Sequence, residues 1–142
     1  MGAILAMPPS AEPGTKVRLV TNKSTKRSSG ILGYSEDPAV DAEGNLCFSE
    51  DQDQSSGNIW KVEIDGKGTI FYSGPSMPNG MEFDPQGRLI ACEKGNVSVF
   101  NSAGTRTPLP MNPASNAGWR INDLTISSSG AMFFTDWDGN NV

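Results

Sequence analysis

The stretch Asn79-GMEFDPQGRLIAC-Glu93 decides the fold, because two other segments of the chain repeat its pattern. The sequence EDPAVDAEGNLCFSE fills residues 36–50, and NDLTISSSGAMFFTD fills residues 122–136, so the three segments begin 43 residues apart. Each has an apolar stretch, a turn that ends on glycine, a second apolar stretch and a closing acid. A repeat of roughly 40 to 50 residues built from short strands is typical of β-propeller blades.

The rest of each unit predicts an all-β protein made of four-stranded antiparallel meanders stacked as blades. Apolar runs separated by Asp-Gly and Gly-containing turns indicate hairpins, and no helical periodicity is present. After the first repeat we expect strands at 58–64 and 69–72. In the second unit we expect strands near 80–84, 88–92, 96–100 and 106–109. The predicted organisation is an N-terminal extension and linker at 1–30, blade 1 at 31–74, blade 2 at 75–117 and an incomplete blade 3 at 118–142.

Charge and composition exclude several functions. Lys and Arg number 11 against 16 Asp and Glu, for a net charge of −5, whereas nucleic-acid binding needs a basic footprint. The chain has no histidine, which excludes a Ser-His-Asp triad and a histidine-rich zinc site within it. Hydrolytic chemistry must therefore rest on carboxylates, amides, hydroxyls or a hard metal ion that takes oxygen ligands.

The N-terminus and the cysteines say little about the compartment. The apolar run near the N-terminus is too short for a membrane span and lacks the basic start of a signal peptide, so no membrane partner is expected and a cytoplasmic location is favoured. Cys47 and Cys92 lie inside apolar stretches, which favours two buried thiols over a disulfide.

The first residue of each repeat is a candidate for a shared site. In a propeller the innermost strands line a central channel, so Glu36, Asn79 and Asn122 are expected near one axis. One carboxylate and two amides offer oxygen ligands that suit calcium. From periodicity alone, capping of backbone groups at the strand ends explains these residues as well as metal binding does.

The closing acids Glu50, Glu93 and Asp136 are expected to return to the same end of each hairpin, with residue 36 paired near residue 49. Their recurrence in all three units favours a structural role, such as binding loop amides, over catalysis. The run that begins at Asp136 lacks the Glu and the helices of an EF-hand, so it predicts a plain turn.

Together with Arg120-INDL-Leu124 and Met132-FFTD-Asp136, the quoted repeats resemble the SMP-30/gluconolactonase/LRE-like family. The resemblance runs from about Tyr34 to Val142. It implies the first half, about two and a half blades, of a six-bladed propeller that holds one divalent metal, usually calcium, and hydrolyses lactones or esters. It also implies that Glu36 is a metal ligand and that Asn122 lies at the metal and the substrate. Asp37 departs from the family's usual glycine, which permits backbone angles that aspartate adopts only at a cost.

These observations predict a fragment of a calcium-dependent lactone or ester hydrolase whose small-molecule substrate binds at Asn122 and whose metal binds at Glu36 and Asn122. The resemblance places the catalytic base outside this chain, because the later blades are missing. The alternative is a non-catalytic propeller segment that acts as a binding or scaffold module. Self-association of two copies into one closed ring is a third interpretation.

Overall fold

The computed structural model describes residues 5–6, 18–19, 34–51, 56–111 and 120–136. These residues form strands, turns and loops, and the described ranges contain no helix. Strands β1 (Leu5–Ala6) and β2 (Arg18–Leu19) pair with each other. The predictions for the linker at 23–29, for Trp119 and Trp137 and for the turn beyond Asp136 fall outside the described residues.

Blade 1 is a four-stranded antiparallel meander in the order β3-β4-β5-β6. Its strands are β3 (Tyr34–Val40), β4 (Leu46–Asp51), β5 (Gly57–Val62) and β6 (Gly68–Gly74). The turn between β3 and β4 closes because the Asp41 carboxylate accepts hydrogen bonds from both the backbone and the side chain of Asn45, at 2.7 and 2.9 Å. Gly44 supplies the positive φ of 86° that this turn requires.

Blade 2 repeats the meander, and blade 3 is represented by two strands. Blade 2 contains β7 (Met81–Phe83), β8 (Leu89–Glu93), β9 (Asn96–Phe100) and β10 (Arg106–Pro108) in that spatial order. Strands β11 (Ile121–Ile126) and β12 (Met132–Asp136) form the hairpin that opens the third unit. The all-β prediction and the strands expected in blades 1 and 2 are confirmed, with ends that shift by up to two residues.

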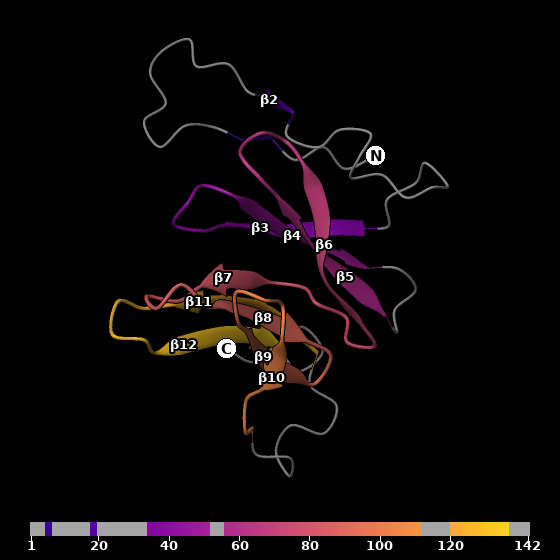
Figure 1. Ribbon diagram of the computed structural model, residues 1–142. Coiled ribbons are helices and arrows are strands. Elements are labelled where there is room, and N and C mark those ends of the chain that lie inside the picture. The colour runs from indigo at the N-terminus through magenta and orange to yellow at the C-terminus, as the bar shows by residue number, and fades with distance from the viewer. Residues whose placement is uncertain (1–4, 7–17, 20–33, 52–55, 112–119, 137–142) are drawn as a thin grey trace.

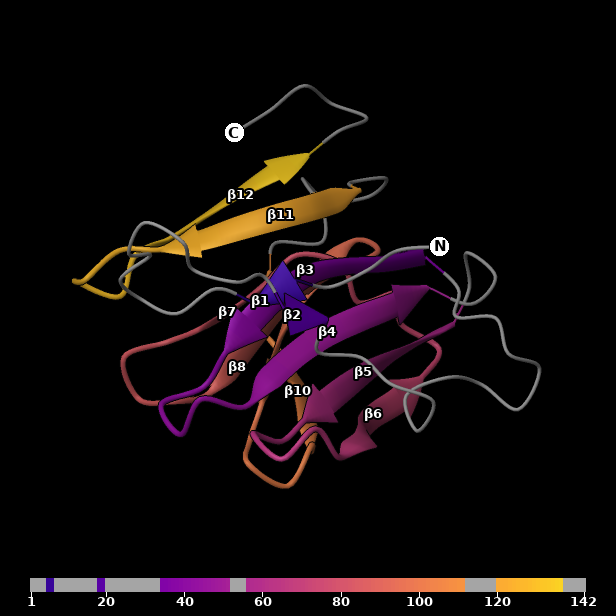
Figure 2. The same ribbon diagram turned by 90° about the horizontal axis from the view of Figure 1, so that it is seen from above.

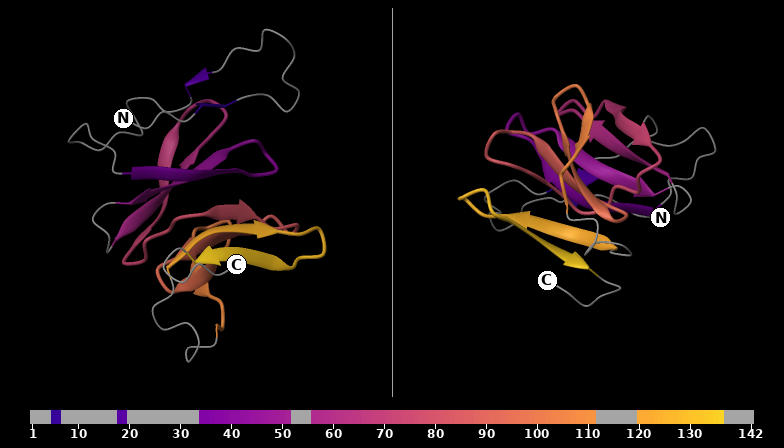
Figure 3. Two further views of the ribbon diagram at one scale, coloured as in Figure 1. Left: turned by 180° about the vertical axis from the view of Figure 1, so that it is seen from behind. Right: turned by 90° about the horizontal axis from the view of Figure 1, so that it is seen from below.

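The three blade sheets pack face to face. The first strands of neighbouring blades lie next to each other. Strand β7 lies between β3 and β11 (Figure 1), and the hairpin β11–β12 forms a separate layer beside blade 2 (Figures 2 and 3). One buried cluster fills the boundary between blades 1 and 2, and a second fills the boundary between blades 2 and 3. The buried thiols Cys47 and Cys92 belong to the first and second cluster respectively, as predicted, and neither forms a disulfide.

The inner strands of blades 1 and 3 each contain an irregularity near their first residues. In β3, Glu36 pairs with Ser49 as predicted, and the register then shifts between Glu36 and Ala39. In β11 the register shifts between Ile121 and Leu124, so the bulge contains Asn122 and Asp123. Bulges re-aim side chains at the ends of strands, and here they fall on the candidate site residues.

The described residues include no helix able to cross a membrane.

Candidate functional site

The starts of the three inner strands meet, which brings two of the three candidate residues into direct contact. Asn79 immediately precedes the β7 segment, and its Nδ2 donates a hydrogen bond of 2.8 Å to Oδ1 of Asn122 on β11. Both side chains are half-buried. Glu36 lies at the matching position of β3, which contacts β7, and its side chain is exposed. Among the described residues the Glu36 carboxylate forms no hydrogen bond or ion pair, with either asparagine or with any other side chain.

Backbone hydrogen bonds hold Asn79 and Gly80 against both neighbouring strands. The Asn79 amide donates to the carbonyl of Cys92 at 2.9 Å, and the Cys92 amide donates to the carbonyl of Gly80 at 2.8 Å. On the other side the Gly80 amide donates to the carbonyl of Asn122 at 2.7 Å. The dipeptide therefore ties blade 2 to blade 3 at the point where the two asparagine side chains meet.

Gly80 permits this approach because it has no side chain. A Cβ at this position would lie 2.6 Å from the backbone oxygen of Asn122 and 2.7 Å from Oδ1 of Asp123, and closer still to the Asp123 Cα. Real Cβ atoms do not come this close to backbone atoms. In the first and third repeats the same position is occupied by Asp37 and Asp123.

Asp37 is the strained residue of the site. It has a φ of 46°, a left-handed value that no other described residue except glycine adopts. The aspartate therefore holds a backbone angle at which glycine is usual. Burial, and after it the negative charges of Asp123 and Glu36, together raise the pKa of Asp37 to about 6. Three carboxylates from two inner strands thus share one negative field.

The donor set at these strand starts fits a hard cation in its chemistry. Glu36, Asn79 and Asn122 offer oxygen atoms only, and Oδ1 of Asn79 is buried without a hydrogen-bond partner among the described residues. Such an orphaned oxygen costs free energy unless a donor or a cation satisfies it. The described residues hold no group of three or more His, Cys, Asp or Glu side chains arranged for a metal, so the amides would have to complete the set.

The closing acids have a structural role, and two of the three, Glu50 and Glu93, bind side chains in place of the loop amides that were expected. Glu50 is fully buried and accepts hydrogen bonds from Asn58 Nδ2 and Trp60 Nε1, each at 2.9 Å. Glu93, 1% exposed, accepts from Ser98 Oγ and pairs with Arg106, whose Nε lies 2.7 Å from Oε1.

Asp136 accepts from the backbone amide of Arg120 at 3.1 Å, which is the loop-amide contact that was predicted. Glu50 and Glu93 instead fasten the outer strands of their own blades. Sequence reasoning also missed Asn79 as the partner of Asn122, although their separation of one repeat was the available signal.

Comparisons with known proteins identify the family. The family model described as SMP-30/Gluconolactonase/LRE-like region matches residues 34–142. The chain belongs to this family. No curated protein sequence matched the chain.

Solved structures share the fold. A gluconolactonase from Xanthomonas campestris superposes with a TM-score of 0.61 at 27% sequence identity. The match covers 74% of this chain and 35% of the gluconolactonase. A putative gluconolactonase gives 0.64 at 16% identity, with coverages of 88% and 48%. Catalytically inactive virginiamycin B lyase from Staphylococcus aureus gives 0.67 at 20% identity, with coverages of 91% and 41%. The chain therefore spans less than half the length of each of these structures.

Proposed function

We propose that this chain forms part of a calcium-dependent hydrolase of lactones or related esters. The observation that carries the proposal is that the starts of the inner strands meet. Asn79 binds Asn122 there, next to the strand that contains Glu36. The chain also belongs to the gluconolactonase-like family. The similarity to a gluconolactonase supports a small sugar lactone as the substrate class.

Glu36 and Asn122 would hold the ion, and Asn122 would also contact the substrate. The hydrogen bond from Asn79 fixes the orientation of the Asn122 amide, because it engages Oδ1 and turns Nδ2 elsewhere. Within the described residues Nδ2 of Asn122 donates to no acceptor, so it is available to a substrate oxygen. Oδ1 keeps a second lone pair for the cation.

A bound calcium ion would polarise the lactone carbonyl and lower the pKa of a water molecule. The chain's own residues position and orient these reactants. Asp37, with its pKa raised to about 6, lies beside Glu36 and contributes negative potential that favours cation binding. No residue of this chain is assigned as the base that takes the proton from water.

Calorimetric titration of Ca²⁺ into the chain tests the ligand assignment. We expect Glu36→Ala to weaken binding about tenfold or more, because it removes the only carboxylate in the proposed set. Glu63→Ala is the matched control, since Glu63 is equally exposed but lies in the turn between β5 and β6. Equal affinities for the Glu36→Ala chain and the unmodified chain would refute the assignment.

A non-catalytic binding or scaffold module is the second candidate function. The strained aspartate at the position of the family's glycine favours it. Hydrolysis of gluconolactone that is lost on chelation and restored by Ca²⁺ supports the hydrolase. Calcium binding without hydrolysis, measured on the complete gene product, would assign the module.

A further inference from the structure

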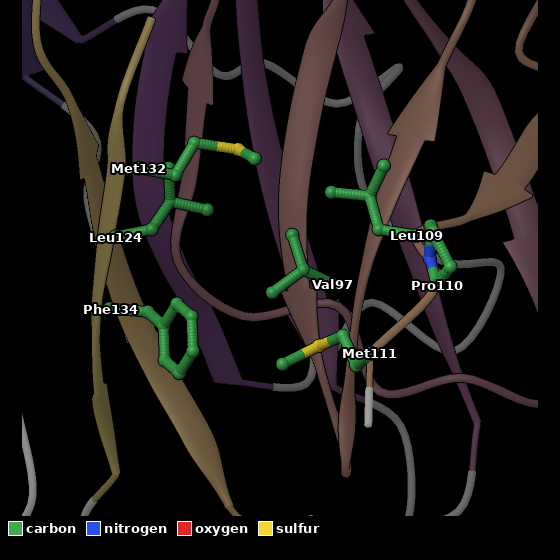
Figure 4. Close-up of a pocket in the computed structure, with 7 residues that line it drawn as sticks. All are labelled: Val97, Leu109, Pro110, Met111, Leu124, Met132 and Phe134. Atoms are coloured by element: carbon green, nitrogen blue, oxygen red, sulfur yellow. The ribbon is translucent and has the colours of Figure 1, made fainter. Parts of the chain in front are cut away.

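The apolar pocket and the inner-strand starts offer different chemistry to a ligand. A pocket of about 370 Å³ lies between the outer strands of blade 2 and the hairpin of blade 3, and its described lining is entirely apolar. Figure 4 shows Leu124, Met132 and Phe134 facing Val97 and Met111 across it. This lining supplies no polar side chain to a sugar lactone. Charged side chains of both signs lie instead at the inner-strand starts.

Lys94 and Arg120 form a pair of cations at this end of the blades. Lys94 follows the last residue of β8, and its backbone forms an isolated antiparallel bridge with that of Arg120, the residue before β11. Cross-strand partners hold their side chains on the same face of a sheet, with Cβ atoms about 5 Å apart. Both residues are exposed. The two positive charges are therefore close together and open to solvent.

This cationic pair lies outward from the asparagines of the proposed site. The Cys92 amide donates to the carbonyl of Gly80 at 2.8 Å, and the Gly80 amide donates to that of Asn122 at 2.7 Å, so these three residues lie at one level. Lys94 comes two residues after Cys92, and Arg120 comes two residues before Asn122. Because β8 and β11 run in opposite directions where they meet, both steps lead the same way. Two residues of a strand span about 7 Å, which is comparable with the span of a six-carbon sugar.

Lys94 has no acid partner within the part of the chain that the structure describes. Three other basic side chains of the blades, Lys61, Arg88 and Arg106, each form an ion pair with an acid of their own blade. The residue opposite Lys94 is instead a second cation, Arg120. Like charges directly opposite each other on neighbouring strands are destabilising. A bound anion would offset this repulsion.

The strand starts thus hold charges of opposite sign at two levels. The acids Glu36, Asp37 and Asp123 belong to β3 and β11, at the level where the proposed cation would bind. Lys94 and Arg120 lie farther out, on the side of blades 2 and 3. A ligand that places a carbonyl oxygen at the cation and a negative charge about one sugar length away would match both levels.

We propose that Lys94, with Arg120 beside it, binds a negatively charged group at the far end of the substrate. The substrate class is then the sugar lactones that carry a phosphate or a carboxylate group in addition to the ring ester. Ammonium and guanidinium groups form charge-assisted hydrogen bonds with both of these anions. The inference rests on the proposed hydrolase function, because it assigns the outer end of a substrate whose carbonyl lies at Asn122.

Calorimetric titration of three stable sugar acids into the chain, in the presence of Ca²⁺, tests the proposal. The compounds are 6-phosphogluconate with a phosphate at the far end, glucarate with a carboxylate there, and gluconate with a hydroxyl. We expect 6-phosphogluconate to bind about fivefold or more tightly than gluconate, because hydrogen bonds to charged groups are strong even where solvent weakens them. The difference should shrink at high salt, which screens exposed charges. Tight binding of glucarate as well would show that a carboxylate suffices, and its absence would assign the group as a phosphate.

Three chain variants show whether Lys94 causes the difference. Lys94→Gln removes the charge from an exposed residue and should remove most of the preference for 6-phosphogluconate. Lys94→Arg keeps the charge and should keep most of the preference. Lys67→Gln is the matched control, because Lys67 is also exposed but lies in the turn between β5 and β6, so the preference should persist. Chelation of Ca²⁺ by the sugar acids is the same with every variant, so comparing variants cancels it.

Equal affinities of the unmodified chain for gluconate and 6-phosphogluconate, or a preference that survives in Lys94→Gln, would overturn the proposal. Binding of Ca²⁺ that depends on Glu36, without any preference for the charged compounds, would refute this inference and leave the proposed hydrolase standing. A preference that depends on Lys94, in a chain that does not bind Ca²⁺, would support the anion site and refute the calcium site.

Discussion

Gly80 is the residue on which the contact between blades 2 and 3 depends at the inner-strand starts. Gly80→Ala would drive a Cβ against the backbone of Asn122 and Asp123, which cannot swing aside as a flexible side chain can. We expect a loss of about 3 kcal/mol in the free energy of unfolding, the upper range for overpacking. Urea denaturation of both chains measures it.

Gly87→Ala is the control for this substitution, because Gly87 has nothing within 4 Å of an added Cβ and differs only in its φ of 75°. The left-handed backbone alone should cost about 1 kcal/mol there. Equal losses at the two glycines would show that close packing at Gly80 contributes nothing to stability.

Asp37 gives the protein a pH dependence at the same site. Its folded-state pKa of about 6 lies above the ordinary value, so the folded chain holds this proton more tightly than the unfolded chain does. Its contribution to stability is therefore largest at low pH and is lost as the pH rises from about 4 through 6. We expect Asp37→Asn to remove this component, as measured by urea unfolding with EDTA across that range.

Asp123 and Glu36 are the charged groups that raise the pKa of Asp37, after burial. Asp123→Asn should therefore shift the transition toward lower pH while Asp37 still titrates. An unchanged pH profile in Asp37→Asn would mean that another group is responsible.

At the scale of strands, the buried acid Glu93 fastens three strands of blade 2 together. It stands at the end of β8, accepts from Ser98 on β9 and pairs with Arg106 on β10, which donates from both Nε and Nη2. Glu93→Ala should cost about 3 to 5 kcal/mol, because Arg106 and Ser98 lose their partner in a buried setting.

The double variant Glu93→Ala, Arg106→Ala isolates the pair. We expect it to be less destabilised than the sum of the two single variants, by about 1 to 3 kcal/mol in thermal or urea unfolding. Additive losses would instead place the cost in packing alone.

The strands themselves were predictable, because alternating apolar residues and glycine turns are local signals that the repeat presents more than once. The pairing of Glu36 with Ser49 followed from the hairpin length. The partners of Glu50 and Glu93 were not predictable. The register of the third and fourth strands decides which buried donors lie next to each acid, and this register is not a local signal. The repeat spacing placed Asn79 and Asn122 near one axis, but the hydrogen bond between their side chains depends on how the blades stack, which no local pattern encodes.

For the whole molecule, the stacking of blades is what brings three separate strand starts together as one candidate site. Glu36 and Asn122 belong to different blades, and β7 of the intervening blade contacts both of their strands. A cation held by Glu36 and Asn122 would therefore link blade 1 to blade 3 in the folded chain only. Because unfolding separates these ligands, calcium binding should add to the stability of the entire stack.

We therefore expect Ca²⁺ at about 100 times its dissociation constant to stabilise the chain by about 2.7 kcal/mol, which raises Tm by several degrees. EDTA should reverse the shift, Glu36→Ala should reduce it by about half or more at the same Ca²⁺ concentration, and Glu63→Ala should leave it intact. Scanning calorimetry at several Ca²⁺ concentrations makes the measurement. The oxygen ligands of the ion would come from two blades, and Mg²⁺ loses its bound water reluctantly. We therefore expect Mg²⁺ to raise Tm less than Ca²⁺ does. A Tm that does not respond to Ca²⁺ would mean that these strand starts gather for packing and not for a metal.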